Sequence, residues 1–185
     1  MNLFINYQFQ YWLTHPSLDA QKLFLIHCDY GEQLIQNRVC HFTHYLNNPQ
    51  SDRMIRLGYL SRDFYDQSAA FFLHPFFAQR DKTRFQIYSY YDGDKVDEIT
   101  GLFQSLSDCW QQVHLLNVEE IAQLIYKDAI DILIDQGAGP TGGRAFEVFA
   151  CKPAPIQLSR YHTSTGLQTF DYRITDIFVD PPEYD

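Results

Sequence analysis

The side chains of this sequence best suited to acid–base chemistry are aspartates that follow strong strand patterns. Asp63 and Asp66 come just after one apolar run, and Asp135 ends another. A carboxylate at the end of a buried strand can orient a hydroxyl or accept its proton. Asp63 and Asp66 could equally cap the helix that is expected to follow them. Asp131, where the chain enters the second run, reads as a charge at the edge of a sheet.

A glycine-rich loop directly follows Asp135 and contains Gly137, Gly139, Gly142 and Gly143. Glycines let backbone N–H groups approach a ligand closely, and the start of a helix favours a phosphate. The loop is therefore a candidate for facing a nucleotide or a sugar, and the alternative is a flexible connection between strand and helix. Its spacing matches neither GxGxxG nor the GxxxxGK(S/T) of a P-loop, so it indicates neither motif.

His162 is the histidine whose position favours chemistry. It lies in a loop after a predicted strand, beside Thr163 and the run to Gly166. A neutral imidazole there could serve as an acid, a base or a donor to phosphate. His41 and His44 have helical spacing, but no carboxylate or cysteine is arranged with them, so we interpret them as packing or surface residues rather than metal ligands. A G-x-S-x-G elbow is absent from the sequence, which leaves hydrolase chemistry without support.

Alternating strand and helix patterns would bring these residues to one edge of a sheet. The sequence predicts strands over 54–60, 84–91, 112–116, 130–135, 156–159 and 174–179, and helices over 68–79, 95–105, 118–127 and 144–151. Asn117 is the expected N-cap of the third of these helices. The alternation predicts an α/β fold, a Rossmann-like parallel sheet with helices on both faces. Because ligands of such sheets bind beyond the carboxyl ends of the strands, the loops 61–67, 135–144 and 160–166 are expected to form the site.

The first part of the chain has a different pattern. Residues 1–48 read as helical, with a helix start near Pro16 to Asp19, and the polar stretch 49–53 reads as a linker. We therefore predict a helical extension over residues 1–50 and a Rossmann-like domain over residues 54–185.

The composition is that of a soluble globular protein with an acidic surface. The 185 residues are 45% hydrophobic and 16% aromatic, which is enough to bury a core. A net charge of −9 argues against nucleic-acid binding, which normally needs a basic face. The four cysteines form no CxxC pair, and neither a signal peptide nor a membrane-length apolar run is present. We expect a cytoplasmic location, with neither nucleic acid nor membrane as a partner.

Four segments in order resemble the catalytic region of the protein O-GlcNAc transferases. Residues 149–157, FACKPAPIQ, are similar to the F-A-x-(R/K)-P-A-P-(I/V)-Q run of that family. Residues 56–64, RLGYLSRDF, resemble its R-V-G-Y-V-S-x-D-F, and residues 132–135 resemble the strand before its glycine-containing loop. Downstream, Thr165-Gly166 and the FDYRITD of residues 170–176 are similar to its S-G and M-D-Y-x-x-x-D.

This resemblance implies a GT-B architecture, in which two Rossmann-like lobes face a cleft. Members of the family transfer N-acetylglucosamine from UDP-GlcNAc to Ser or Thr hydroxyls of proteins, with inversion at the anomeric centre, and use no bound metal or other cofactor. Most donor contacts come from the carboxyl-terminal lobe. The resemblance places residues 54–185 in the amino-terminal lobe, so the chain is expected to lack the donor-binding lobe and to be inactive alone.

The chain departs from the family pattern in its loops. Gln67 stands where the family has a histidine, four residues after Asp63. The loop after Asp135 lacks the aromatic or imidazole ring of the family, and the loop 161–166 is shorter. An amide does not titrate, so Gln67 cannot be a general base.

The resemblance and the strand ends together give a set of candidate site residues. We expect Asp63, Asp135, Arg144, His162 and Asp171 to face the cleft, with Gln67 and Thr163 in the loops that face substrate and donor. Asp135 or His162 would assist deprotonation of the acceptor. The expected partners are an acceptor protein or peptide and either a separate donor-binding lobe or a second copy of the chain, because a lone lobe exposes an apolar face. Two alternatives stay open: a catalytically inactive lobe acting as a protein-interaction module, and a split gene.

Overall fold

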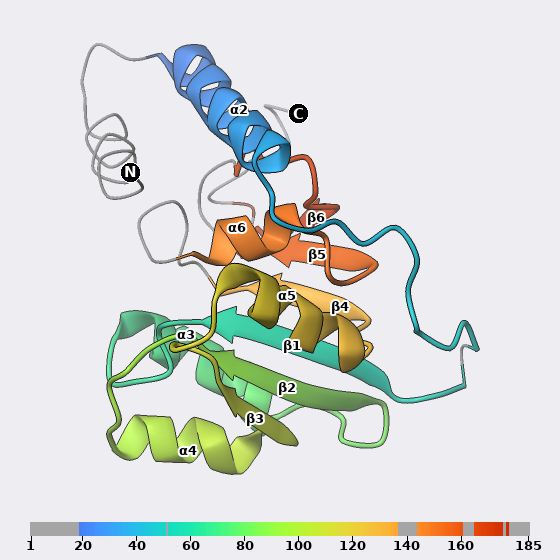
Figure 1. The fold of residues 1–185 in the computed structure, drawn as a ribbon. Helices are drawn as coiled ribbons and strands as arrows, with labels where there is room; N and C mark the ends of the chain where they lie inside the picture. Colours follow the sequence, from blue (N-terminus) through green and yellow to red (C-terminus); the bar gives the residue numbers. More distant parts are fainter. Residues whose placement is uncertain (1–18, 51, 137–143, 161–164, 176, 178–185) are drawn as a thin grey trace.

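The computed structural model describes residues 19–50, 52–136, 144–160, 165–175 and 177 of the chain. Within these ranges six parallel strands form one sheet in the order β3-β2-β1-β4-β5-β6 (Figure 1). The strands are β1 (Ile55–Ser61), β2 (Phe85–Tyr91), β3 (Cys109–Gln112), β4 (Ile132–Asp135), β5 (Ile156–Ser159) and β6 (Tyr172–Arg173). The helices are α2 (Ala20–Gln36), α3 (Ser68–Ala78), α4 (Glu98–Leu106), α5 (Val118–Lys127) and α6 (Ala145–Ala150). The predicted α/β class and parallel sheet are confirmed.

Helices cover the two faces of the sheet unequally. The helices α5 and α6 pack on one face, which we call the α5 face, around a buried cluster that includes Leu60, Leu133, Ile121 and Phe149. On the opposite face, here the α3 face, α3 and α4 pack around Tyr59, Phe77 and Phe103 among others. Helix α2 contacts α6 and lies on the α5 face (Figure 1). Side chains from alternate positions of each strand therefore enter two separate cores.

Helix α5 forms because its start is specified locally. The Asn117 side chain accepts a hydrogen bond from the Glu120 backbone N–H at 2.9 Å, and the Glu120 carboxylate accepts from the Asn117 N–H at 2.7 Å. This reciprocal capping satisfies two backbone donors that the helix itself leaves unpaired. The predicted N-cap and the predicted range of this helix are both confirmed.

The long helix predicted for the first part of the chain is wrong beyond Gln36. Asn37 is the C-cap of α2, and its backbone N–H still makes a helical hydrogen bond to the Gln33 carbonyl. The chain then crosses the molecule without helix, held by a hydrogen bond from the Phe42 N–H to the Cys151 carbonyl at 3.1 Å. Phe42 stacks on Tyr126 of α5 with ring centroids 4.4 Å apart. Phe42, one of the apolar residues that suggested a helix there, is partly buried by these tertiary contacts, whereas Val39 is 60% exposed.

Two edge strands also lie away from their predicted positions. Strand β3 ends at Gln112, and the chain turns directly afterwards, because the Leu116 N–H bonds the Val113 carbonyl at 2.9 Å. Strand β6 consists of residues 172–173 rather than 174–179, of which residues 176, 178 and 179 lie outside the described ranges. The residues that form each edge strand are determined by pairing with an inner strand, and local β-propensity does not predict this pairing.

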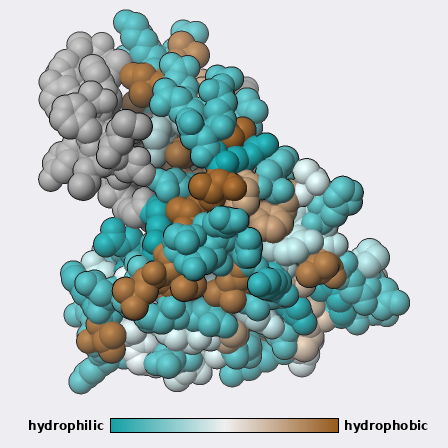
Figure 2. All heavy atoms as spheres, in the orientation of Figure 1, coloured by the Kyte–Doolittle hydropathy of each residue, from teal (hydrophilic) through white to brown (hydrophobic). Residues whose placement is uncertain are grey.

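The surface of the α5 face is mixed. Apolar residues appear there in small separate groups among hydrophilic ones (Figure 2). Among the helices of the described ranges, we find none with the length and apolar character needed to cross a membrane.

Candidate functional site

The strand register brings the last residues of the inner strands to one edge of the sheet. Ser61 of β1 lies opposite Tyr91 of β2, Leu60 lies opposite Asp135 of β4, and Asp135 lies opposite Ser159 of β5. The chain order reverses between β1 and β4, which are neighbours in the sheet. Ligands of open parallel sheets bind beyond the carboxyl ends of the strands at such a reversal. This edge is therefore the candidate site.

Asp63 lies in the first loop at this edge. Its backbone N–H donates to the Ser61 hydroxyl oxygen at 3.0 Å, and the Gln67 side-chain amide donates to its carbonyl at 3.4 Å. The N-cap of α3 is Gln67, without a side-chain capping bond, so the expectation that Asp63 or Asp66 caps this helix is wrong. The structure thus brings two predicted site residues, Asp63 and Gln67, together in one loop.

The environment of Asp63 makes its carboxyl a weaker acid than an ordinary aspartate. Burial raises the pKa of Asp63. This effect outweighs the influence of the Arg62 and Lys95 charges and of the Gln67 side-chain amide, each of which lowers the pKa. The side chain remains half-exposed. A carboxylate with a raised pKa that a ligand can reach is better matched to proton transfer near neutral pH than an unperturbed one.

Arg144 joins two loops at the same edge to the start of α6. Its guanidinium donates to Asp92 Oδ1 at 2.7 and 3.2 Å, to the Val113 carbonyl at 3.0 Å and to the His114 carbonyl at 2.9 Å, and it also bonds the Leu116 carbonyl. The residue predicted to face the cleft therefore holds the loops after β2 and β3 against the start of α6. Asp92, its ionic partner, was missed by sequence reasoning, although it follows the end of β2 in the way that Asp63 follows β1.

Asp135 ends β4 and is fully buried. It follows Ile134, which belongs to the core of the α3 face, so strand alternation directs Asp135 toward the α5 face. Of the two predicted carboxylates at the reversal point, Asp63 is consequently the one that a ligand can reach from solvent in this conformation.

Asp171 lies apart from these residues. Its carboxylate accepts a hydrogen bond from the Gln157 N–H at 2.7 Å and pairs with Lys152, which also donates to the Thr169 carbonyl at 2.8 Å. Gln157 stands two positions before the carboxyl end of β5. The structure therefore gives Asp171 the role of fixing β6 and α6 beside β5, and does not bring it together with Asp63.

His162 and Thr163 lie outside the described residues, as does the glycine-rich loop 137–143. In the rest of the chain, no group of three or more His, Cys, Asp or Glu side chains is placed so as to hold a metal ion.

Comparison with known proteins gives consistent matches. A family model described as Glycosyl transferase family 41 matches residues 27–185. The probable UDP-N-acetylglucosamine–peptide N-acetylglucosaminyltransferase SPINDLY of Arabidopsis thaliana is 32% identical over 168 residues, which is 88% of this chain and 18% of that protein. The UDP-N-acetylglucosamine–peptide N-acetylglucosaminyltransferase of Caenorhabditis elegans is 29% identical over 140 residues, 71% of this chain and 12% of that protein.

A solved structure agrees with these matches. A mutant of the O-GlcNAc transferase of Thermobaculum terrenum superposes with a TM-score of 0.90 at 26% sequence identity, over 100% of this chain and 35% of that one. The chain thus spans 18% of the Arabidopsis relative and 35% of the solved structure.

Proposed function

The chain belongs to glycosyl transferase family 41, and from this premise we propose that it forms the acceptor-facing lobe of a protein N-acetylglucosaminyltransferase. The observation that carries the proposal is the family match over residues 27–185, joined to a candidate site at the reversal point of the sheet. In this proposal UDP-GlcNAc is the donor and a Ser or Thr hydroxyl of a protein is the acceptor. Most of the donor contacts belong to a second lobe, and no resident metal takes part, as the family resemblance implies.

The names of the relatives support the choice of acceptor. The Arabidopsis and Caenorhabditis proteins are named as transferases that act on a peptide. A peptide acceptor suits the carboxyl edge, where the half-exposed Asp63 follows β1 and the buried Asp135 ends β4. Extended peptides can reach such an edge more readily than an enclosed cavity.

Asp63 is the described residue best placed to handle the acceptor hydroxyl. As the hydroxyl oxygen bonds to the anomeric carbon, the bond from that carbon to the UDP oxygen breaks, and the hydroxyl proton must pass to a base. The carboxylate of Asp63, with its raised pKa, orients the hydroxyl and accepts this proton. Gln67 donates a hydrogen bond to the Asp63 backbone and so holds the loop in place.

A binding experiment on the purified chain tests whether this lobe binds the acceptor and leaves most of the donor contacts to a second lobe. We expect a Ser-containing acceptor peptide to shift the backbone NMR signals of residues 61–67, and UDP to cause no saturable shift up to millimolar concentration. An Asp63→Asn variant should keep the fold and change the peptide-induced shifts. Saturable binding of UDP at micromolar concentration would place the donor site in this lobe and contradict the proposal.

A second candidate is an interaction module without transferase activity. It is favoured by the outer surface of α3, where Phe71, Phe72 and Phe76 are 78%, 64% and 51% exposed. Contiguous apolar side chains of this size usually mark a contact with another protein. Transfer activity of a complete two-lobed protein that contains this chain separates the two candidates.

A further inference from the structure

The loop that carries Asp63 is bonded to a second loop through Asp97, a residue outside the candidate site described above. Asp97 is the N-cap of α4, in the segment that follows β2, and the segments after β1 and β2 leave the sheet at the same edge (Figure 1). Its carboxylate Oδ2 accepts a hydrogen bond from the Asp66 backbone N–H at 2.8 Å. The two residues are 31 positions apart, so this bond joins two loops that their local structure does not bring together.

The other carboxylate oxygen of Asp97 caps α4. Oδ1 accepts hydrogen bonds from the Thr100 backbone N–H at 2.8 Å and from the Thr100 hydroxyl at 3.0 Å, and this hydroxyl accepts one from the Asp97 N–H at 3.2 Å. Hydrogen bonds from the Asp66 and Thr100 backbone N–H groups lower the pKa of Asp97, so its carboxylate is ionised at neutral pH. One carboxylate therefore performs two tasks, each with a different oxygen.

The buried Phe64 fixes the loop directly after Asp63. Its ring centroid lies 6.0 Å from that of Phe77 in α3 and 5.3 Å from that of Phe103 in α4. The bond from Asp66 to the N-cap of α4 holds the loop on the other side of Phe64. The loop thus has an apolar anchor and a polar anchor, and together they set the path of its backbone.

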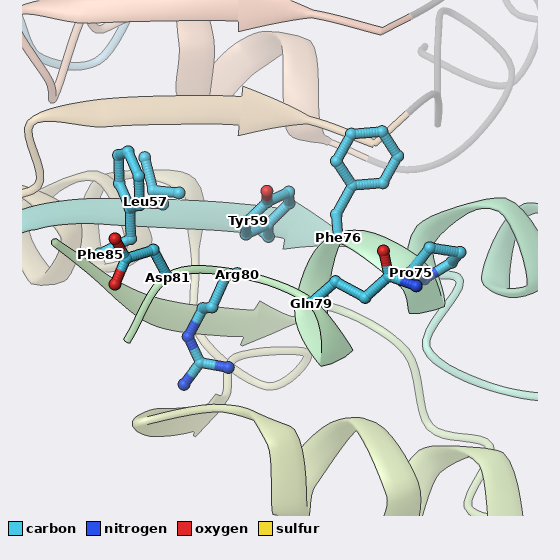
Figure 3. Close-up of a pocket in the computed structure, with 8 residues that line it drawn as sticks. All are labelled: Leu57, Tyr59, Pro75, Phe76, Gln79, Arg80, Asp81 and Phe85. Carbon is cyan, nitrogen blue, oxygen red and sulfur yellow. The ribbon is translucent and has the colours of Figure 1, made fainter. Parts of the chain in front are cut away.

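Helix α3, which follows the loop, stands partly clear of the sheet. A groove of about 420 Å³ lies between its last turns and the strands β1 and β2, and Tyr59, Phe76 and Gln79 are among the residues that line it (Figure 3). The first buried residue of α3 is Ala70, and residues 65–69 all keep contact with solvent. The packing of α3 therefore leaves the end of the loop to be held by contacts of its own, and the bond to Asp97 is such a contact.

We propose that Asp97 is a positioning residue for the acceptor site, because its bond to the Asp66 N–H holds the loop 61–67 with the Asp63 carboxylate placed to meet the acceptor hydroxyl. The inference rests on the proposed function, in which Asp63 receives the proton of that hydroxyl. Asp97 acts through geometry, since the charges that lower the pKa of Asp63 are those of Arg62 and Lys95. A misplacement of about 1 Å at a reacting group can cost roughly 100-fold in rate, so a single bond of this kind matters.

Two substitutions separate the tasks of Asp97. Asparagine caps helices as well as aspartate does, so in Asp97→Asn the remaining oxygen keeps its two bonds with Thr100, and the amide nitrogen faces the Asp66 N–H, donor against donor. Thr100→Val removes the hydroxyl from the cap and leaves the bond between Asp66 and Asp97 in place. We expect the urea midpoint of Asp97→Asn to stay near that of the wild type, and the midpoint of Thr100→Val to fall.

Hydrogen exchange of the chain alone, followed by NMR, tests the bond itself. The Asp66 amide should exchange at least ten-fold faster in Asp97→Asn than in the wild type, and at the wild-type rate in Thr100→Val. The Ile121 amide, which bonds the Asn117 carbonyl at 3.0 Å in α5, should keep its rate in both variants and serves as the internal control. An Asp66 rate that Asp97→Asn leaves unchanged would overturn the inference, whatever the function of the chain.

Transfer kinetics test the positioning role. In a chimera that joins this chain to the second part of the Thermobaculum terrenum enzyme, Asp97→Asn should lower kcat for a Ser-containing peptide at least five-fold and leave the KM for UDP-GlcNAc unchanged. Thr100→Val should keep the wild-type kcat. Faster exchange at Asp66 with an unchanged kcat in Asp97→Asn would overturn the inference alone.

A wild-type chimera that transfers nothing would defeat the proposed function alone. Peptide-induced NMR shifts of residues 61–67 in the chain would then decide the inference. These shifts should be smaller in Asp97→Asn than in Thr100→Val, and equal shifts in the two variants would overturn it.

Discussion

At the scale of single residues, the Asp131 carboxylate binds three other residues. It accepts hydrogen bonds from Nη1 and Nη2 of Arg53, each at 2.6 Å, from the Asn47 side-chain amide at 2.6 Å and from the Arg56 backbone N–H at 2.9 Å. Burial acts to raise the pKa of Asp131, but these hydrogen bonds outweigh it and lower the pKa. Asp131 therefore ties the segment before β1 to the start of β4. Our reading of Asp131 as an edge charge understated this role.

Replacing Asp131 by Asn should lower the free energy of unfolding at pH 7 by about 2 kcal/mol, because Arg53 loses its ionic partner. A depressed carboxyl pKa contributes stability that is complete at neutral pH and is lost as the pH falls through the folded-state value. The difference between wild type and variant should therefore shrink toward acid pH in urea unfolding. Asp94→Asn, at an exposed position, is the matched control and should change little. A difference that does not vary with pH would refute this account of Asp131.

Asp63 should behave in the opposite way. A raised carboxyl pKa means that ionisation costs stability at neutral pH, so Asp63→Asn should leave the unfolding free energy unchanged or slightly higher. In a chimera that joins this chain to the second part of the Thermobaculum terrenum enzyme, the rate of GlcNAc transfer should rise with pH through a pKa above that of an ordinary aspartate. The Asp63→Asn variant should lose this rise. A pH–rate profile that the substitution leaves intact would remove Asp63 from the reaction.

At the scale of elements, Arg144 shows how one side chain fixes several loops. The single ammonium group of lysine cannot donate from several positions as the planar guanidinium does. Arg144→Lys should therefore lower the unfolding free energy by about 2 kcal/mol. Hydrogen exchange should increase in the loops that contain Asp92 and His114. Arg84→Lys, at an exposed position, provides the control. If the two substitutions have equal effects on the unfolding free energy, the hydrogen bonds of Arg144 do not contribute to stability.

Helix α2 is docked through a glycine contact. A Cβ added at Gly31 would lie 2.1 Å from the Gly166 carbonyl oxygen, whereas one at Gly101 of α4 would meet no atom within 4 Å. Gly31→Ala should therefore destabilise the protein by about 1–3 kcal/mol through overpacking. Gly101→Ala should stabilise it by up to about 1 kcal/mol through helix propensity. Denaturant unfolding of both variants measures the contrast, and stabilisation by both would show that α2 is free to shift.

What could be predicted from the sequence depended on the range of the interactions. Helix α5 and its Asn117 cap are specified within four residues, and the burial of β1 and β4 follows from their own apolar runs. The end of α2 and the position of β6 depend on partners far along the chain, so local patterns misplaced them. The bond between Arg144 and Asp92 joins residues 52 positions apart, and no pattern in the sequence signals it. The closeness of Asp63 and Gln67 could be predicted because both residues lie in one short loop.

At the scale of the whole molecule, two surfaces formed by the described residues are candidates for contact with partners. One is the carboxyl edge of the sheet, where Asp63 lies, and the other is the α3 face with its exposed phenylalanines. In the function that we propose, the carboxyl edge receives the acceptor, and the phenylalanines of the α3 face lie outside that site. The matched relatives are longer than this chain, which makes a two-lobed protein that contains the chain the right object for the decisive measurement.

That measurement is GlcNAc transfer by the chimera that joins this chain to the second part of the Thermobaculum terrenum enzyme. With UDP-GlcNAc and a Ser-containing peptide, we expect mass spectrometry to detect one N-acetylglucosamine on the peptide, at a rate that the Asp63→Asn variant lowers at least ten-fold. A chimera that binds UDP-GlcNAc as tightly as the parent enzyme but leaves the peptide unmodified would contradict the central claim, and would favour an interaction module instead.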